Sequence, residues 1–377
     1  MEKFEIIITT LFGLESVTVR EVRRMGYETS SVEDGRVTFL GDMEAVFKAN
    51  LWIRTGERVL IKVAEFTAVT FEELFEQTKS VKWHHWIGKD DAFPVKGYSL
   101  KSILASVRDC QAIIKKAIAE SLSEKHRISW FEETGAVYQI QFSLLKDKVT
   151  LMIDTSGEGL HKRGYRRVSN AAPLKETLAA AMVELSPWKY EYPLCDPFCG
   201  SGTIPIEAAM IKRNIAPGLW RSFAFERFSQ TDMRMWNMIK EEAEASEKNI
   251  ALDICACDID ADTVEIARCN ADNAGVGAFV KPFQGDARKI MTAKSYGTVI
   301  CNPPYGERLG EIKECERLYR EIGLNFQKWD KWSYYIITSN ENFEKCFGKK
   351  ANKKRKLYNG MIKCNLYQFF GERPPKI

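Results

Sequence analysis

The chain has 377 residues, of which 45% are hydrophobic and 28% are charged, and its formal net charge is +4. This composition is typical of a water-soluble globular protein with two or three domains, and the mild positive charge permits nucleic-acid binding without requiring it. No apolar run approaches the ~20 residues of a membrane span, and the first residues lack a signal-peptide core. The ten cysteines form no C-x-x-C pair, and the closest histidines are His84 and His85. We therefore expect no metal site, no membrane association and the reduced thiols of a cytoplasmic protein.

The first 65 residues alternate between short strand-like and helix-like segments. The predicted elements are a strand over residues 4–9, a helix over 14–25, a turn at 33–36 leading into a strand over 37–40, a helix over 43–50 and a strand over 58–63. Asp42 is expected to cap the second helix, because aspartate is favoured at helix N-caps. The β-α-β-β-α-β order predicts a ferredoxin-like α+β module over residues 1–65.

Residues 66–155 predict a second α+β module. Its expected elements are a helix over residues 71–78 capped by Thr70, a strand over 94–99, a long helix over 106–121, and two strands over 138–144 and 149–154. The last two strands are expected to pair as a hairpin. A linker over residues 156–171 follows, and its basic side chains Lys162, Arg163, Arg166 and Arg167 are predicted to contact nucleic-acid phosphates. A solvated linker is the alternative for such a charge run.

A glycine-rich turn over residues 196–203, with the sequence DPFCGSGT, is the strongest local signal. It lies between an apolar run and a helix-forming segment, so a strand, a turn and a helix start are expected. Glycine lets a ligand approach the backbone closely. The turn lacks the lysine of a P-loop and the G-x-G-x-x-G spacing of a nicotinamide site. Asp196 at the strand end instead favours a cationic or hydroxyl-rich ligand.

Three further polar residues follow predicted strands of the same segment, namely Asp258, Asp286 and Asn302. Each aspartate alone is explained equally well as a helix N-cap. In open α/β sheets, however, ligands bind at the carboxyl ends of the strands, so the series with Asp196 indicates one site. Residues 213–250 separate the first two acids by more than a Rossmann-like sheet requires, and we interpret them as an insertion that either covers the site or elaborates the surface.

The turn at 196–203 and the Asn302-Pro303-Pro304-Tyr305 sequence together resemble the cofactor and catalytic loops of class I S-adenosylmethionine-dependent methyltransferases that modify base amino groups. The resemblance implies a Rossmann-like seven-stranded domain over residues 172–377. It implies that Asp258 accepts the ribose hydroxyls of the cofactor. The full set of implied cofactor-binding residues is Asp196, Phe198, Gly200, Ser201, Gly202, Thr203, Asp258, Ile259, Asp286 and Ala287.

The resemblance also assigns roles around the target amine. The side-chain oxygen of Asn302 and the carbonyl of Pro303 are expected to accept its two N–H bonds, which would aim the nitrogen at the cofactor methyl group. Pro303 and Pro304 in series stiffen the loop for such positioning. Tyr305 is expected to stack on a flipped base.

Residues 66–155 resemble a THUMP domain, the RNA-binding module that precedes the catalytic domain of several RNA-modifying enzymes. With the linker and the insertion, the resemblance covers nearly the whole chain and is to THUMP-containing 23S ribosomal RNA guanine-N2 methyltransferases. It implies an RNA partner, ribosomal RNA in particular. The alternatives are a transfer RNA guanine-N2 methyltransferase, an N6-adenine methyltransferase of DNA or RNA, and a non-catalytic RNA-binding protein. The sequence does not indicate an oligomeric state.

Overall fold

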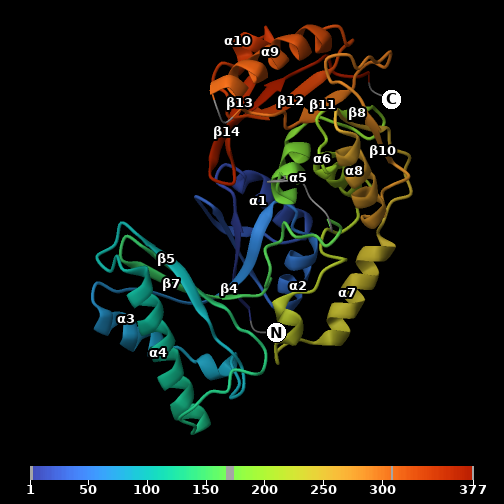
Figure 1. Ribbon diagram of the computed structural model, residues 1–377. Helices are drawn as coiled ribbons and strands as arrows, with labels where there is room; N and C mark the ends of the chain where they lie inside the picture. The colour runs from blue at the N-terminus through green and yellow to red at the C-terminus, as the bar shows by residue number, and fades with distance from the viewer. Residues whose placement is uncertain (1–2, 167–173, 307–308, 376–377) are drawn as a thin grey trace. The chain divides into compact units, whose positions relative to one another are not determined.

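Two seven-stranded sheets form the framework of the computed structural model, which describes residues 3–166, 174–306 and 309–375 (Figure 1). The chain divides into two units, and neither is a continuous stretch of sequence. The first unit contains Met1–Thr10, Thr18–Leu160 and Arg221–Glu241, and the second contains Leu11–Val17, His161–Trp220 and Glu242–Ile377.

The elements of the first unit follow the sequence prediction closely. In chain order they are β1 (Phe4–Thr10), α1 (Glu15–Arg24), β2 (Thr29–Glu33), β3 (Arg36–Gly41), α2 (Met43–Trp52), β4 (Gly56–Thr67), α3 (Phe71–Lys79), the 3-10 helix η1 (Trp83–His85), β5 (Val95–Leu100), α4 (Val107–His126), β6 (Ile140–Leu145) and β7 (Lys148–Asp154). The caps expected from sequence are present: Asp42 accepts the N–H of Ala45 at the start of α2, and Thr70 forms a capping box with Glu73 at the start of α3.

One long strand joins the two predicted α+β modules into a single sheet of order β2-β3-β1-β4-β7-β6-β5. The twelve-residue β4 pairs antiparallel with β1 through its first half, from Gly56 to Ile61, and with β7 from Leu60 to Thr67. The strands β6 and β7 form the expected hairpin, whereas β5 runs parallel to β6. A connection of this kind keeps the backbone hydrogen bonds of both modules paired across their junction.

The insertion belongs to the first unit between Arg221 and Glu241, and it contains the 3-10 helix η2 (Ala224–Arg227) and most of α7 (Met233–Ala245). The ring of Phe225 stacks on Phe47 of α2 with a centroid distance of 4.8 Å. Phe228 stacks on Tyr138 at 4.0 Å, and the Tyr138 hydroxyl accepts the N–H of Ser229. The insertion is therefore an apolar contact partner of both α+β modules.

The second unit contains β8 (Leu194–Asp196), β9 (Ile254–Asp258), β10 (Val280–Gln284), β11 (Thr298–Cys301), β12 (Ser333–Thr338), β13 (Lys353–Asn359) and β14 (Ile362–Phe369), with the helices α5 (Glu176–Leu185), α6 (Thr203–Lys212), α8 (Ala261–Asn273), α9 (Leu309–Phe326) and α10 (Phe343–Phe347). Their strand order is β10-β9-β8-β11-β12-β14-β13. The first five strands are parallel, and β14 is antiparallel to both of its neighbours. The predicted fold class, a Rossmann-like seven-stranded domain preceded by an α+β region, is confirmed.

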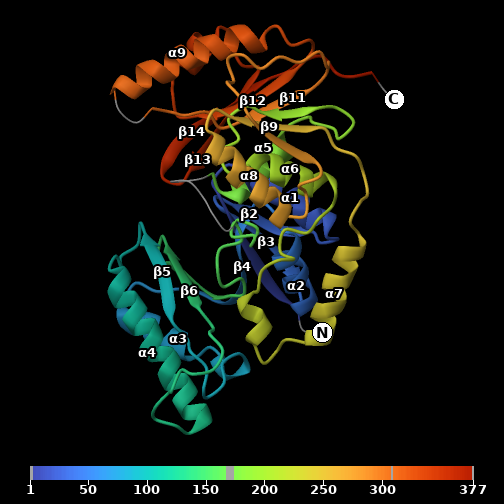
Figure 2. The same ribbon diagram turned by 45° about the vertical axis from the view of Figure 1, so that its right-hand side comes forward.

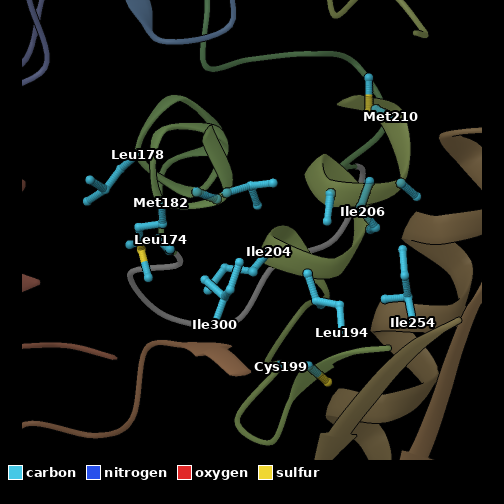
Figure 3. Packing of buried hydrophobic residues seen from close by; sticks show 14 of the residues in the cluster. Leu174, Leu178, Met182, Leu194, Cys199, Ile204, Ile206, Met210, Ile254 and Ile300 are labelled. Carbon is cyan, nitrogen blue, oxygen red and sulfur yellow. The ribbon is translucent and has the colours of Figure 1, made fainter. Parts of the chain in front are cut away.

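Helices cover both faces of the second sheet (Figure 2). The helices α9 and α10 lie on one face, where Tyr319 and Phe326 of α9 pack with Phe343 of α10. The helices α5, α6 and α8 cover the other face, where Met182 and Ile206 pack against strand residues such as Ile254 (Figure 3). Burial on both faces explains why these strands read as continuous apolar runs. No helix among the described residues is both long and apolar enough to cross a membrane.

The N-terminal stretch Leu11–Val17 belongs to the second unit, where it lies along the edge strand β13. The guanidinium of Arg355 donates to the carbonyl of Gly13 at 2.9 Å and to the hydroxyl of Ser16 at 2.8 Å. A Cβ on Gly13 would lie 2.9 Å from the carbonyl oxygen of Lys356, and the Gly13 backbone has a φ of +89°. Glycine is thus required for this close approach.

Candidate cofactor and substrate site

A cavity of about 520 Å³ opens at the carboxyl ends of β8, β9, β10 and β11. Neighbouring parallel strands bring together residues that lie more than one hundred positions apart in sequence. Eleven of the predicted cofactor and catalytic residues line it: Asp196, Phe198, Gly200, Ser201, Thr203, Asp258, Ile259, Asp286, Ala287, Asn302 and Pro304. Gly202, Pro303 and Tyr305 do not.

The glycine turn is fixed to β9 by backbone hydrogen bonds. The N–H of Gly200 donates to Oδ2 of Asp258 at 2.9 Å, and the N–H of Cys199 donates to the carbonyl of Cys257 at 2.8 Å. Gly202 precedes α6 with a φ of +85°, and a Cβ there would meet Ala267 of α8 at 3.2 Å. Gly202 therefore allows the helices to pack closely instead of lining the cavity.

Asp196 is almost completely buried, with 1% of its surface exposed. Burial raises the pKa of its carboxyl group well above the ordinary value of 3.8, the N–H of Phe198 lowers it in part, and the nearby Asp258 raises it further. The ionised form of this carboxyl group is therefore costly. A cation bound in the cavity would offset this cost, and a cationic ligand is one of the two kinds, cationic or hydroxyl-rich, expected from sequence.

Asp258 presents a partly exposed carboxylate to the same cavity. Its Oδ2 accepts the N–H of Gly200, and its Oδ1 accepts the N–H of Asp260 at 3.1 Å. Each carboxylate oxygen has a second acceptor position. The group can thus accept two adjacent hydroxyl donors without losing its backbone contacts.

Asp286 is paired with a residue that the sequence analysis missed. The guanidinium of Arg288 donates to both carboxylate oxygens of Asp286, at 2.7 and 2.8 Å for the shortest contact to each. These hydrogen bonds are the main cause of the lowered pKa of Asp286. Arg288 also lines the cavity and contacts Glu321 at 3.3 Å. The sequence did contain a signal for this pair, because the basic Arg288 lies two residues after the acidic Asp286.

The loop from Asn302 to Tyr305 is held by two tyrosine hydroxyls. The hydroxyl of Tyr305 donates to Oδ1 of Asn302 at 2.5 Å, and that of Tyr319 donates to the carbonyl of Pro304 at 2.6 Å. The ring of Tyr305 packs against the apolar core, and Nδ2 of Asn359 contacts its hydroxyl at 3.5 Å. Burial raises the pKa of Tyr305, so the phenol is a neutral donor at ordinary pH. The predicted stacking of Tyr305 on a base stays a prediction.

Two of the basic residues of the linker contact α6, the helix that follows the glycine turn. Arg163 is buried at 2% exposure and pairs with the fully buried Glu207 of α6 at 3.4 Å. The prediction that Arg163 contacts RNA phosphates is wrong, because this guanidinium lies inside the fold.

Arg166 lies beside the same helices. It pairs with Glu176 of α5 at 3.3 Å and donates to the hydroxyl of Thr203 at 2.5 Å. Lys162 is exposed, and Arg167 lies outside the described residues. The linker therefore joins α5 to the first turn of α6, next to the cavity.

Known families match the chain in three consecutive segments. Residues 163–368, more than half of the chain, match the family described as "RMKL-like, methyltransferase domain". Residues 5–60 match the "RlmL ferredoxin-like domain", and residues 68–154 match the THUMP domain. The first match identifies the segment that contains the cavity as a methyltransferase domain, and the cofactor of this protein is S-adenosylmethionine.

Individual relatives agree with these matches. The chain is 48% identical to the Bacillus subtilis (strain 168) protein named "Putative RNA methyltransferase YpsC", over 100% of this chain and 98% of that protein. It is 35% identical to the "Ribosomal RNA large subunit methyltransferase K/L" of Psychromonas ingrahamii over 97% of its own length, and it spans 50% of that relative.

A solved structure gives the same result in three dimensions. The crystal structure described as "SMU.472, a putative methyltransferase complexed with SAH" has a TM-score of 0.94 and 43% identity, with 100% of both chains covered. In that protein the fold holds S-adenosylhomocysteine. The chain described here, with its ferredoxin-like, THUMP and catalytic segments in this order, belongs to the RMKL-like family of S-adenosylmethionine-dependent methyltransferases.

Proposed function

We propose that this methyltransferase transfers a methyl group to the exocyclic N2 of a guanine in RNA, and that its substrate is 23S ribosomal RNA. The observation that carries the proposal is the position of Asn302. Its side chain follows β11 directly and lines the cavity that also contains Asp196 and Asp258. An amide oxygen next to the cofactor site is suited to accept the N–H bonds of an amine.

The cofactor would be held by the strand-end acids. Asp258 would accept its ribose hydroxyls and Asp286 its adenine amino group, and the exposed side chain of Ile259 would pack on the adenine ring. When bound, S-adenosylmethionine supplies a methyl group on a sulfonium, a cation that the buried carboxylate of Asp196 favours. The residues fit this ligand because the cavity combines three carboxylates with an apolar wall and a glycine turn.

The target amine is a poor nucleophile because its lone pair is delocalised into the base. Oδ1 of Asn302 and the carbonyl of Pro303 would accept its two N–H bonds and so direct the lone pair towards the methyl group. Oδ1 of Asn302 currently accepts the hydroxyl of Tyr305. When a base binds, the Tyr305 hydroxyl would therefore have to share Oδ1 of Asn302 with the amine or give up this hydrogen bond. In the second case the Tyr305 ring would be free to stack on the base.

An RNA substrate is supported by the THUMP segment and by the names of the relatives. The choice of 23S ribosomal RNA follows the relatives named "Ribosomal RNA large subunit methyltransferase K/L". This chain spans about half of such a relative, so nothing that the other half does is attributed to it. Transfer RNA guanine, adenine N6 and binding without catalysis are the outcomes that the experiment separates.

The test uses a strain in which the gene is deleted. Its ribosomal and transfer RNA would be separated, incubated with the full-length protein and S-adenosylmethionine, and digested to nucleosides for mass spectrometry. We expect the incubation to add N2-methylguanosine to 23S RNA of the deletion strain and to add none to 23S RNA of the parent strain, which already carries the mark. N6-methyladenosine would overturn the choice of base, a mark in transfer RNA would overturn the choice of RNA, and no methyl transfer to either would overturn the proposal.

A further inference from the structure

The edge strand β13 has two different faces. Side chains on one face serve the fold: Leu357 is completely buried in the core, and Arg355 binds the stretch Leu11–Val17. Side chains on the other face, at Lys354, Lys356 and Tyr358, are exposed or partly exposed. Lys354 pairs with Glu344 at 2.7 Å. The remaining two residues of this face are not explained by the packing of the strand.

Lys356 and Tyr358 form a cluster with Phe12. The ring of Phe12 is 44% exposed and lies edge-on to the ring of Tyr358, with a centroid distance of 6.3 Å. The ammonium group of Lys356 is 5.8 Å from the Phe12 centroid and 5.4 Å from the Tyr358 centroid. Within the described part of the chain, Lys356 has no carboxylate partner. We call Phe12, Lys356, Tyr358 and the exposed Lys363, which faces Tyr358 across the hairpin, the hairpin platform.

This platform is connected to the catalytic loop through one residue. Asn359 follows Tyr358 and points to the opposite face of the strand, where its Nδ2 contacts the hydroxyl of Tyr305. Tyr305 in turn donates to Asn302. The platform is therefore next in sequence to a residue that contacts the catalytic loop, and both belong to the second unit.

We propose that the hairpin platform binds single-stranded RNA next to the nucleotide that enters the active site. A neighbouring base would stack on Phe12 or Tyr358, and Lys356 and Lys363 would bind the adjoining phosphates. Exposed aromatic rings interleaved with cations are the usual surface for unpaired nucleic acid, because every base offers a flat π-face. A duplex hides these faces, so the platform selects single strands. The inference rests on the proposed RNA substrate but not on the choice of base.

The first test measures binding of the full-length protein to a fluorescein-labelled oligouridylate by anisotropy over a series of salt concentrations. We expect Phe12→Ala and Tyr358→Ala each to raise the Kd about tenfold without changing its salt dependence, because stacking involves no counterion. Lys356→Ala should reduce the slope of log affinity against log salt by about 0.7, the value for one phosphate contact on a single strand.

Matched controls come from the same unit. Lys281→Ala removes an exposed lysine from β10, the strand at the opposite edge of the sheet, and Tyr190→Ala removes a ring that is 42% exposed before β8. Both should bind the oligouridylate as the wild type does. Unchanged S-adenosylhomocysteine affinity in all variants would show that the fold is intact.

A second test locates the contact directly. An oligouridylate with 5-iodouridine, irradiated on the wild-type protein, should crosslink to the peptides that contain Phe12 or Tyr358. The proposal would be overturned if Phe12→Ala and Tyr358→Ala bound the probe as tightly as the wild type. It would also be overturned if the two control variants weakened binding equally, or if the wild type did not bind the probe. Because neither test requires methyl transfer, a wrong choice of base under the proposed function would leave both results standing.

Discussion

At the residue scale, Asp196 combines a buried carboxyl group with a position in the candidate cofactor site. Because burial raises its folded-state pKa, ionising Asp196 costs folding free energy, and this cost grows as the pH rises from the unfolded-state pKa through the folded-state pKa. We predict that Asp196→Asn raises the melting temperature of the cofactor-free protein by about 2–4 °C, or roughly 1 kcal/mol, at pH 8. The gain should be smaller at pH 5, because part of the wild-type group is then protonated.

Calorimetry with and without S-adenosylmethionine checks this prediction. The variant should lose most of the stabilisation that the cofactor confers on the wild type. Asp286→Asn should instead lower the melting temperature. Arg288 lowers the pKa of Asp286, so the ionised form of this group is favoured in the fold. An Asp196→Asn protein that is less stable at pH 8 and still stabilised by the cofactor would contradict the assignment.

Asn302 is the residue on which the proposed chemistry depends. We predict that Asn302→Ala leaves cofactor affinity near normal and lowers the rate of methyl transfer at least about a hundredfold, as expected for loss of a transition-state contact. Tyr305→Phe keeps the ring and removes the hydroxyl that occupies Oδ1 of Asn302, so methyl transfer should be retained. Titration calorimetry and single-turnover kinetics separate the two effects. A full rate in Asn302→Ala would exclude the mechanism.

At the scale of elements, a buried ion pair joins the linker to α6, the helix that follows the glycine turn. Arg163→Ala would leave the buried Glu207 without its charged partner and with the Tyr165 hydroxyl as a neutral donor, which we predict to cost about 3–5 kcal/mol. Lys162→Ala removes the same charge from the surface and should cost at most ~0.5 kcal/mol. Chemical unfolding monitored through cofactor binding compares them. Equal stability of the two variants would show that the buried pair is unimportant to the fold.

Signals that are local in sequence predicted the elements well. Asp42 and Thr70 were identified as caps because a cap acts on residues three positions away. Asp196 and Asp258 end apolar strands, and Asn302 follows one directly. Features that depend on a partner far away in the sequence could not be predicted from local patterns. The burial of Arg163 depends on Glu207, forty-four residues later, and a basic run in sequence looks the same whether it is buried or exposed.

The insertion illustrates the same limit. Its aromatic residues were visible in the sequence, but their partners Phe47 and Tyr138 lie about 180 and 90 residues earlier, so no local pattern could pair them. The structure adds a role inside the first unit to the two that the sequence suggested. The insertion completes the apolar core of that unit.

At the scale of the molecule, each unit contains a segment from the opposite half of the chain: Arg221–Glu241 in the first unit and Leu11–Val17 in the second. We predict that residues 172–377 alone do not form a stable catalytic unit, because they lack Leu11–Val17 and Arg163 and would expose Phe225 and Trp236. The fragment should aggregate or show no cooperative melting, whereas the full chain should melt cooperatively. A soluble fragment with wild-type cofactor affinity would refute this prediction.

The exchanged segments also constrain the order of events during synthesis. The first unit needs the stretch Arg221–Glu241, so it cannot finish folding when its own modules leave the ribosome at Leu160. The stretch Leu11–Val17 emerges among the first residues but must await β13, made more than three hundred residues later. Because distant contacts slow folding, the nascent chain would present its unfinished apolar surfaces to chaperones for most of its translation, and a gene divided between the two units would yield two incomplete products.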